Sequence, residues 1–336
     1  MLIGKQTWYF SHKPRILGTG TVVGEKEGKG PLGQSFDRSV TDPYFGQSSF
    51  EKAERKAMEM AQETAVQKAG LTMAMIDLIV SGDLLAQNIS SHFAGRTSGR
   101  PLFNVFSACA TSMQAVMLGA QLVDSDCANY VMAAVSSHNS SAERAFRTPT
   151  EYGAQKPPTA HCTVTGAGAA VIGKGIAGIR ITYATIGKIV DLGIDNPWEM
   201  GAAMAPAAVD TIKQHFEDTK RTPDDYDLIV TGDLARVGHP IARSLLRKEG
   251  ICLDERFTDC GILMYDENQP EVFSGGSGPA CAACVTFGYL LQGMEEGRYQ
   301  KILVIATGAL LSLLSSQQKE SIPCIAHAVA FEREET

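Results

Sequence analysis

The sequence lacks the features that define several classes of protein. Its 336 residues contain no apolar stretch of the about 18 residues that a membrane-spanning helix needs; the longest candidate, Ile302–Leu314, has 13. The N-terminal residues contain no apolar run followed by a small-residue cleavage site, so we expect no signal peptide. We therefore expect a soluble chain without a transmembrane helix.

The cysteines do not form the pattern of a disulfide scaffold, and no metal motif is present. Eight irregularly spaced cysteines are too few for a disulfide scaffold, which predicts a reducing compartment and free thiols. Cys281 and Cys284 form a lone C-x-x-C without a second pair at zinc spacing. Gly28, Gly30 and Gly33 spell G-x-G-x-x-G, but Pro31 interrupts the motif and no helix follows. We expect neither a metal nor a cofactor.

Basic residues are not in excess either. The net charge of -7 excludes a general nucleic-acid-binding surface. The 44% of hydrophobic and 20% of charged residues are typical of a soluble globular protein large enough to bury a substantial core.

An internal repeat organises the chain. Asp77–Leu84 reads DLIVSGDL, and Asp227–Leu234 reads DLIVTGDL, 150 positions later. Apolar strands alternate with helices around both copies, which predicts parallel pairing with right-handed crossovers. The sequence therefore predicts an α/β fold of two pseudo-symmetric βαβ-type halves, residues 1–178 and 179–336, in stacked α-β-α-β-α layers.

Periodicity and end signals place the main elements. A helix is expected over residues 50–69, with Ser48 and Glu51 as a capping box and Gly70 after its end. Further helices are expected over 109–123, 207–217 and 279–294, and strands over 16–23, 102–106, 130–135, 163–173, 179–190, near 272–273, and over 302–306 and 325–332.

Cys109 stands where an apolar strand gives way to a helix of small residues. Unpaired N–H groups at a helix start stabilise a thiolate, so we expect a lowered pKa, and they can bind an oxyanion. The alternative is a small buried packing residue, as free cysteines often are.

Ser107–Ala115, SACATSMQA, resembles the nucleophile segment of the thiolase/ketosynthase superfamily. Gly166–Gly173, GAGAAVIG, is similar to the glycine-rich strand that closes the first half of those enzymes. This resemblance covers the whole chain and implies a thiolase-like fold, a homodimer and Cys109 as the catalytic residue.

At two other positions the sequence differs from the pattern of those enzymes. Condensing enzymes place a His, Asn or Glu after the strand equivalent to Leu228–Val230, where this chain has Asp233. They place a second His or Asn where this chain has Gly276 and Ser277. His239, in a GHP segment like that of thiolases, is the remaining candidate for a catalytic histidine.

A closer resemblance over the full length is to the stage V sporulation protein AD family. It is carried by SACATSMQA and by three further segments: residues 136–170, Asp195–Ile212 (DNPWEMGAAMAPAAVDTI) and Thr231–Ala242 (TGDLARVGHPIA). The resemblance implies a dipicolinate- or calcium-dipicolinate-binding component of the spore uptake machinery. It also implies membrane-protein partners from the same operon and a peripheral position at the spore inner membrane.

A site for this small, flat dianion needs cationic or N–H donors around an apolar slot. The predicted loop between the strands at Tyr130 and Thr163 lies at the carboxyl end of its strand, where α/β ligand sites form. The alternative is a solvated surface loop. The loop contributes five candidates: His138, Arg144, Arg147, Lys156 and His161.

Two functions from different classes follow. The missing catalytic partners favour a binding protein, with Cys109 and Asp233 added to the ligand-binding set together with Gly276 and Ser277. The alternative is an acyl-thioester condensing enzyme or acyltransferase that uses Cys109 as its nucleophile. Because the usual partner residues are missing, its catalytic site would be degenerate. A non-catalytic scaffold with a vestigial pocket is a third reading.

Overall fold

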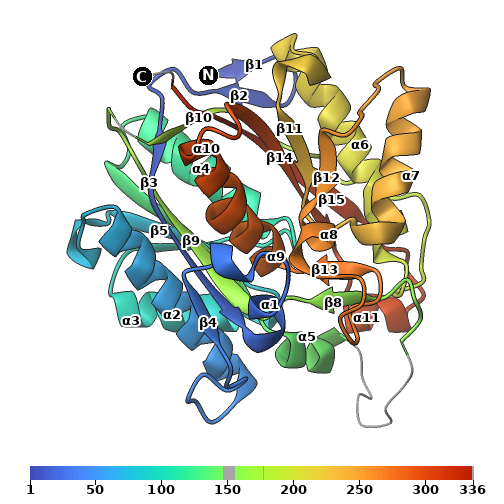
Figure 1. Cartoon of the computed structure of the whole chain (residues 1–336), viewed down its shortest axis with the longest axis horizontal. Coiled ribbons are helices and arrows are strands. Elements are labelled where there is room, and N and C mark those ends of the chain that lie inside the picture. Colours follow the sequence, from blue (N-terminus) through green and yellow to red (C-terminus); the bar gives the residue numbers. More distant parts are fainter. Residues whose placement is uncertain (147–155, 177, 335–336) are drawn as a thin grey trace.

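The computed structural model describes residues 1–146, 156–176 and 178–334. Helices and β-sheet alternate in five layers (Figure 1). α2 (Phe50–Lys68) and α3 (Ile89–Ser98) cover the outer face of the N-terminal strands. α6 (Met200–Thr219) and α7 (Ala235–Lys248) lie outside the C-terminal strands. The predicted α-β-α-β-α layering is therefore confirmed.

The sheet has the same strand order in both halves. From the centre outwards, the N-terminal half runs β3-β9-β7-β5-β6 and the C-terminal half runs β10-β15-β14-β11-β12. The two first strands pair where Ile16 meets Ile179 and Arg15 meets Arg180. These strands are β3 (Arg15–Gly24), β5 (Leu78–Gly82), β6 (Leu102–Asn104), β7 (Tyr130–Ser137), β9 (Gly166–Gly173), β10 (Ile179–Thr185), β11 (Leu228–Thr231), β12 (Phe257–Asp259), β14 (Lys301–Ala309) and β15 (Cys324–Glu332). The boundary at residue 178 stays a prediction.

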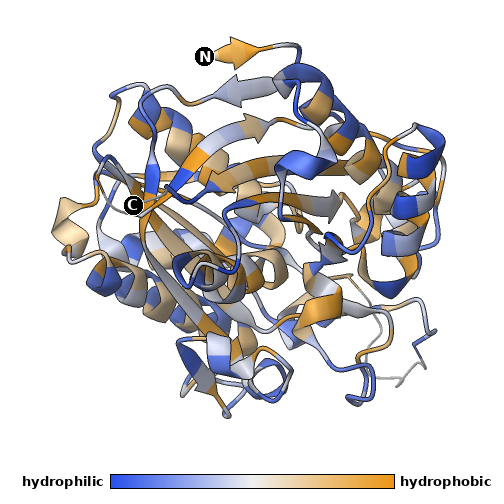
Figure 2. Ribbon diagram, turned by 45° about the horizontal axis from the view of Figure 1, so that its top comes forward, coloured by the Kyte–Doolittle hydropathy of each residue, from blue (hydrophilic) through white to orange (hydrophobic). Residues whose placement is uncertain are grey.

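Two helical segments fill the space between the two halves of the sheet. One is α4 (Thr111–Asp124), and the other runs through α9 (Pro279–Cys284), the π-helix η6 (Val285–Leu290) and α10 (Leu291–Glu295). Small residues let them approach the strands closely: a Cβ on Gly168 would lie 2.7 Å from the Cβ of Ala283. Figure 2 shows hydrophobic residues along the strands and hydrophilic residues on the outer helices, as burial of both sheet faces requires.

Short elements complete the fold. They are β1 (Leu2–Ile3), β2 (Thr7–Tyr9), α1 (Glu25–Gly28), η1 (Gly33–Ser35), β4 (Arg38–Val40), η2 (Met73–Met75), η3 (Ala86–Asn88), α5 (Asn139–Phe146), β8 (His161–Thr163), η5 (Pro223–Asp225), α8 (Cys260–Met264), β13 (Gly275–Ser277) and α11 (Leu313–Gln317). β13 and β8 form a separate two-stranded parallel sheet. Within the described ranges, no helix is long and apolar enough to cross a membrane.

Several predicted boundaries were wrong for local reasons. The cap of α2 is Ser49, whose extended backbone lets its hydroxyl accept the Lys52 N–H, so Ser48 and Glu51 form no capping box. No strand forms at Phe273, because its φ of 53° breaks the extended conformation, and β13 begins at Gly275.

Two helices also differ from the prediction. α6 begins at Met200 instead of Ala207. The segment predicted as a loop after β7 contains α5 (Asn139–Phe146), whose Ala142, Glu143 and Arg144 are good helix formers.

Candidate functional site

Cys109 lies in a tight turn before α4 and not inside the helix. Ala108 has a φ of 49°, a strained left-handed conformation for a residue with a side chain. The hydroxyl of Thr111 accepts the Ser107 N–H at 3.0 Å and donates to the Ala108 carbonyl at 2.6 Å. These bonds close the turn, so α4 begins at Thr111, two residues after Cys109.

Asp233, just after β11, is the ionisable neighbour of Cys109. Its carboxyl is buried and hydrogen-bonds the Cys109 thiol. Thr307 Oγ1 donates to Asp233 Oδ1 at 2.6 Å, and the Gly278 N–H donates to Oδ2 at 3.2 Å. Burial outweighs these bonds and raises the pKa of Asp233 to about 7.

The expectation of a lowered pKa for Cys109 is wrong. Burial, followed by the negative charge of Asp233, raises the pKa of the Cys109 thiol well above its usual value. The N–H of Gly278 favours the thiolate, but its effect is smaller. At neutral pH Cys109 is therefore a protonated thiol beside a carboxyl, the reverse of an activated nucleophile.

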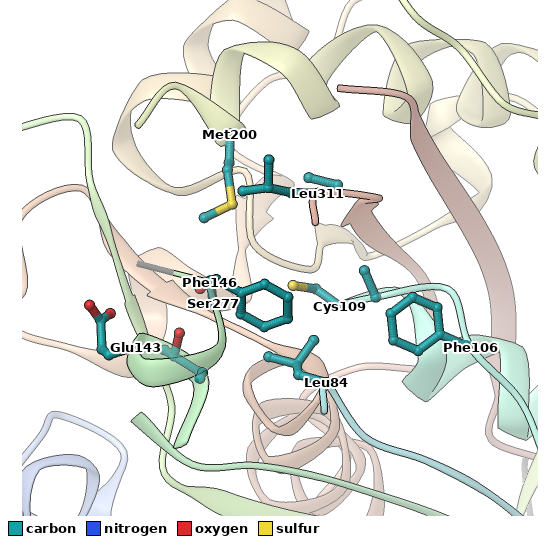
Figure 3. A pocket seen from close by; sticks show the side chains of 12 residues that line it. Leu84, Phe106, Cys109, Glu143, Phe146, Met200, Ser277 and Leu311 are labelled. Atoms are coloured by element: carbon teal, nitrogen blue, oxygen red, sulfur yellow. The ribbon is translucent and has the colours of Figure 1, made fainter. Parts of the chain in front are cut away.

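A small cavity opens in front of Cys109. Figure 3 shows the sulfur pointing into it, with Phe146 opposite, Met200 and Leu311 on one side and Leu84 on the other. Its volume is about 50 Å³. Most of the wall is apolar, and the complete lining is Leu84, Phe106, Ala108, Cys109, Ala142, Glu143, Phe146, Thr163, Met200, Ser277, Ala309 and Leu311.

The two positions at which condensing enzymes place a His, Asn or Glu and a second His or Asn meet at this cavity. Asp233 contacts Cys109, and Ser277 lines the wall. Gly276 belongs to the same strand but faces away, because a Cβ there would lie 3.1 Å from the Cys281 sulfur. No histidine or asparagine is among the described lining residues.

The candidates from the segment after β7 do not converge on Cys109. Lys156 comes nearest, since its Nζ lies 3.2 Å from a carboxylate oxygen of Glu143, which lines the cavity. Arg144 forms an ion pair with Glu51 on α2. Arg147 lies outside the described residues.

The histidines are held away from the cavity by other contacts. His138 Nε2 binds the Pro43 carbonyl at 2.9 Å and Nδ1 accepts the Ser140 N–H at 3.2 Å, so the ring is a neutral structural link. His161, on β8, is fully buried and does not line the cavity.

His239, the candidate catalytic histidine, lies on α7. Its ring stacks on Phe257 at 4.3 Å, and its Nε2 lies 3.2 Å from the Phe257 carbonyl oxygen. Burial, then the positive charge of Arg243, lowers the pKa of His239 to about 4. His239 is therefore neutral and outside the lining of the cavity.

The repeat gives Asp233 a counterpart with a different role. Asp83 accepts the Ser91 N–H at 2.8 Å and the Ser91 hydroxyl at 2.7 Å, and so caps the start of α3. Asp233 instead binds a thiol, a threonine and a loop N–H. The same sequence motif is thus structural in one half and part of the site in the other.

Sequence reasoning missed the walls of the cavity. Leu84, Phe146, Met200 and Leu311 come from four separate segments, and no local pattern distinguishes them from core residues. Thr307, the residue that fixes Asp233, was also missed. The repeated motif ending at Leu84 was the one signal that pointed to this region.

Comparison with known proteins gives matches of two kinds. The profile of the family described as Stage V sporulation protein AD matches residues 4–332. A Stage V sporulation protein AD from Bacillus subtilis (strain 168) is 51% identical over 332 residues, covering 99% of this chain and 98% of the relative.

Solved structures of condensing-enzyme homologues show the same fold. The 3-oxoacyl-(acyl-carrier-protein) synthase III of Aquifex aeolicus has a TM-score of 0.60 at 17% identity, covering 95% of this chain and all of that one. Cerulenin-bound OleA of Xanthomonas campestris has a TM-score of 0.62 at 14% identity, covering 96% and 99%. These similarities confirm the predicted thiolase-like fold.

The reactivity of Cys109 follows from its surroundings. We predict that iodoacetamide at pH 8 alkylates Cys109 at least tenfold more slowly than the exposed Cys127 and Cys252, as measured by peptide mass spectrometry. Asp233→Asn removes the neighbouring charge and should raise the rate at Cys109 by about tenfold, one pKa unit. Wild-type labelling of Cys109 as fast as that of Cys127 would contradict this assignment.

The buried carboxyl of Asp233 also makes stability depend on pH. With a pKa of about 7 when folded against 3.8 as its ordinary value, the folded state holds a proton that the unfolded state has lost. Stability is therefore lost as the pH rises from about 4 to 7. Relative to wild type, Asp233→Asn should become more stable over this interval by a few kcal/mol.

Urea unfolding of both proteins at pH 5 and 7.5 measures this difference. Comparing the variant with wild type cancels the opposing contribution of His239 and His327, whose pKa values burial lowers to about 4. A difference in unfolding free energy that stays constant between the two pH values would show that Asp233 has an ordinary pKa.

Proposed function

The chain belongs to the stage V sporulation protein AD family, and we propose that this sporulation protein is a dipicolinate-binding component of the spore uptake machinery. The family is known from the match over nearly the full length. The ligand is our proposal, and it concerns the cavity at Cys109.

The Cys109–Asp233 pair carries the choice of a binding protein over an enzyme. A condensing enzyme needs a thiolate and a group that polarises the donor carbonyl. Here the raised pKa of Cys109 keeps the thiol protonated. At the position where condensing enzymes have their second His or Asn, this chain has Gly276 and Ser277. These residues supply neither an imidazole nor an amide side chain.

The walls of the cavity suit a flat aromatic acid. Leu84, Phe146 and Leu311 offer apolar surface for a pyridine ring. Thr163 and Ser277 add hydroxyl groups to the cavity lining. Lys156 is not in the lining itself but forms an ion pair with Glu143, which is. A half-protonated Asp233 repels a dianion, or its calcium chelate, less than an ionised carboxylate would.

The cavity must widen to admit such a ligand. A volume of about 50 Å³ is well below the roughly 300–1,000 Å³ of usual small-molecule sites. Dipicolinate has 12 non-hydrogen atoms and needs several times more space than this cavity offers. Met200 and Leu311 have flexible side chains and face Cys109 from one side, so they are the residues that we expect to move.

We further propose that the protein acts beside membrane proteins of the same operon, at the spore inner membrane. This assignment rests on family membership.

Calorimetry with purified protein tests the ligand. We predict saturable binding of dipicolinate, with or without calcium. Lys156→Gln should lower the affinity for dipicolinate by about tenfold, because it removes one charge-assisted hydrogen bond. Cys109→Leu should weaken it further by filling the cavity. Lys174→Gln, which changes an exposed lysine paired with Asp126, is the control and should bind as wild type does.

Two outcomes would overturn the proposal. One is no heat of binding at millimolar dipicolinate in either the presence or the absence of calcium. The other is a mass increase on Cys109 after incubation with acyl-CoA thioesters, which would establish the alternative, an acyltransferase with Cys109 as its nucleophile.

We also propose a homodimer that pairs through β6. This strand ends the sheet with one neighbour, β5, so its other edge offers unpaired N–H and C=O groups. Phe103 on β6 is 55% exposed and Phe106 just beyond it is 48% exposed. Phe106 also lines the cavity at Cys109, so the dimer would cover one wall of the site.

Light scattering after gel filtration tests the dimer. We predict a dimer for wild type and a monomer for Phe103→Lys, because a charge at this edge opposes strand pairing. Ile176→Lys changes a residue that is 99% exposed elsewhere and should stay dimeric. A wild-type monomer at 50 µM would refute this arrangement.

A further inference from the structure

A second, larger cavity lies away from Cys109. Its volume is about 320 Å³, within the usual range of small-molecule sites and about six times that of the cavity at Cys109. It shares no lining residue with the Cys109 cavity. The lining is largely polar and consists of Thr19, Gln34, Ser35, Phe36, Asp37, Lys68, Phe287, Gly288, Leu291, Gln292 and Glu295.

The π-helix η6 (Val285–Leu290) forms one wall of this cavity. A π-turn frees carbonyl groups that an α-helix would use, and such turns are frequent at functional sites. The Thr19 hydroxyl donates to the Phe287 carbonyl at 3.2 Å. Gly288 allows the η1 segment to lie directly on the helix, since a Cβ there would come within 2.8 Å of the Ser35 carbonyl oxygen.

A fixed ion pair forms a second wall. Lys68 Nζ lies 2.5 Å from Asp37 Oδ1. Asp37 Oδ2 accepts the Thr21 N–H at 2.9 Å and the Thr21 hydroxyl at 3.1 Å. Both oxygens of the Asp37 carboxylate thus have partners, and the Lys68 ammonium retains hydrogen-bond donors.

The remaining polar side chains mainly offer acceptors. Within the described part of the chain, Gln34 and Glu295 make no hydrogen bond or ion pair. Gln292, three residues before Glu295 on the same face of α10, donates its Nε2 to Glu296 and so leaves its carbonyl oxygen for another donor. Because the charges of Lys68 and Asp37 cancel, the lining residues carry a net charge of -1, which is that of Glu295.

We propose that this cavity binds a small hydroxylated amine, such as an amino sugar. Glu295 pairs with the ammonium group, and the amides of Gln34 and Gln292 take the hydroxyls, each of which can both donate and accept. Lys68 donates to a further hydroxyl. The site is separate from the cavity at Cys109, so it does not depend on the function proposed for that cavity.

Ligand-observed NMR with D-glucosamine as the probe tests this site in the full chain. We expect saturable binding, weakened about tenfold in Glu295→Gln and in Gln34→Ala. Sorbitol, which lacks the amine, and gluconate, which carries the opposite charge, should bind more weakly than glucosamine. Glu295 and Gln34 are both exposed, so neither substitution threatens the fold, and thermal melting checks this.

Two controls separate this site from other effects. Glu255→Gln removes the same charge from an exposed position outside the lining and should leave glucosamine binding unchanged. Cys109→Ala should also leave it unchanged. No binding at 10 mM glucosamine, equal binding of gluconate, or equal affinity in Glu295→Gln would each overturn the proposal.

Discussion

The contact between the Cys109 thiol and the Asp233 carboxyl is the interaction on which the site depends. Cys109 comes from the turn before α4, in the first half of the chain, and Asp233 follows β11 in the second. Thr307 on β14 and the N–H of Gly278 hold the carboxyl in place. Burial raises the pKa of both groups, and the charge of Asp233 raises that of Cys109 further, so the thiol stays protonated where a condensing enzyme would need a thiolate.

This arrangement supports the binding role that we propose for a chain with a thiolase-like fold. The fold brings the ends of several strands to one point, and the residues at that point decide the chemistry. Asp233 stands at the position where condensing enzymes have a His, Asn or Glu, and glycine and serine occupy the position of their second His or Asn. The walls remain apolar, so the place that would receive an acyl chain still suits a flat organic molecule.

The layers could be predicted from the sequence because repetition and hydrophobic periodicity are properties of the chain itself. The site could be predicted in part: Cys109, Asp233 and Ser277 lie where the repeat and the resemblance indicated. The direction of the Cys109 pKa shift could not, because it depends on a carboxyl 124 positions away and on burial by segments distant in the sequence. Nor could the positions of His138 and Arg144 outside the cavity lining, because their partners, Pro43 and Glu51, lie in segments that no local pattern connects to them.

The pairing of β3 with β10 bears on how the molecule folds. Although the sequence repeats itself, its two first strands meet at the centre of one hydrogen-bonded sheet, and Arg15 and Arg180 both bind Glu334 near the C-terminus. A half expressed alone would expose this central strand as an open edge, which favours aggregation. We therefore expect the two halves to fold together as one cooperative unit.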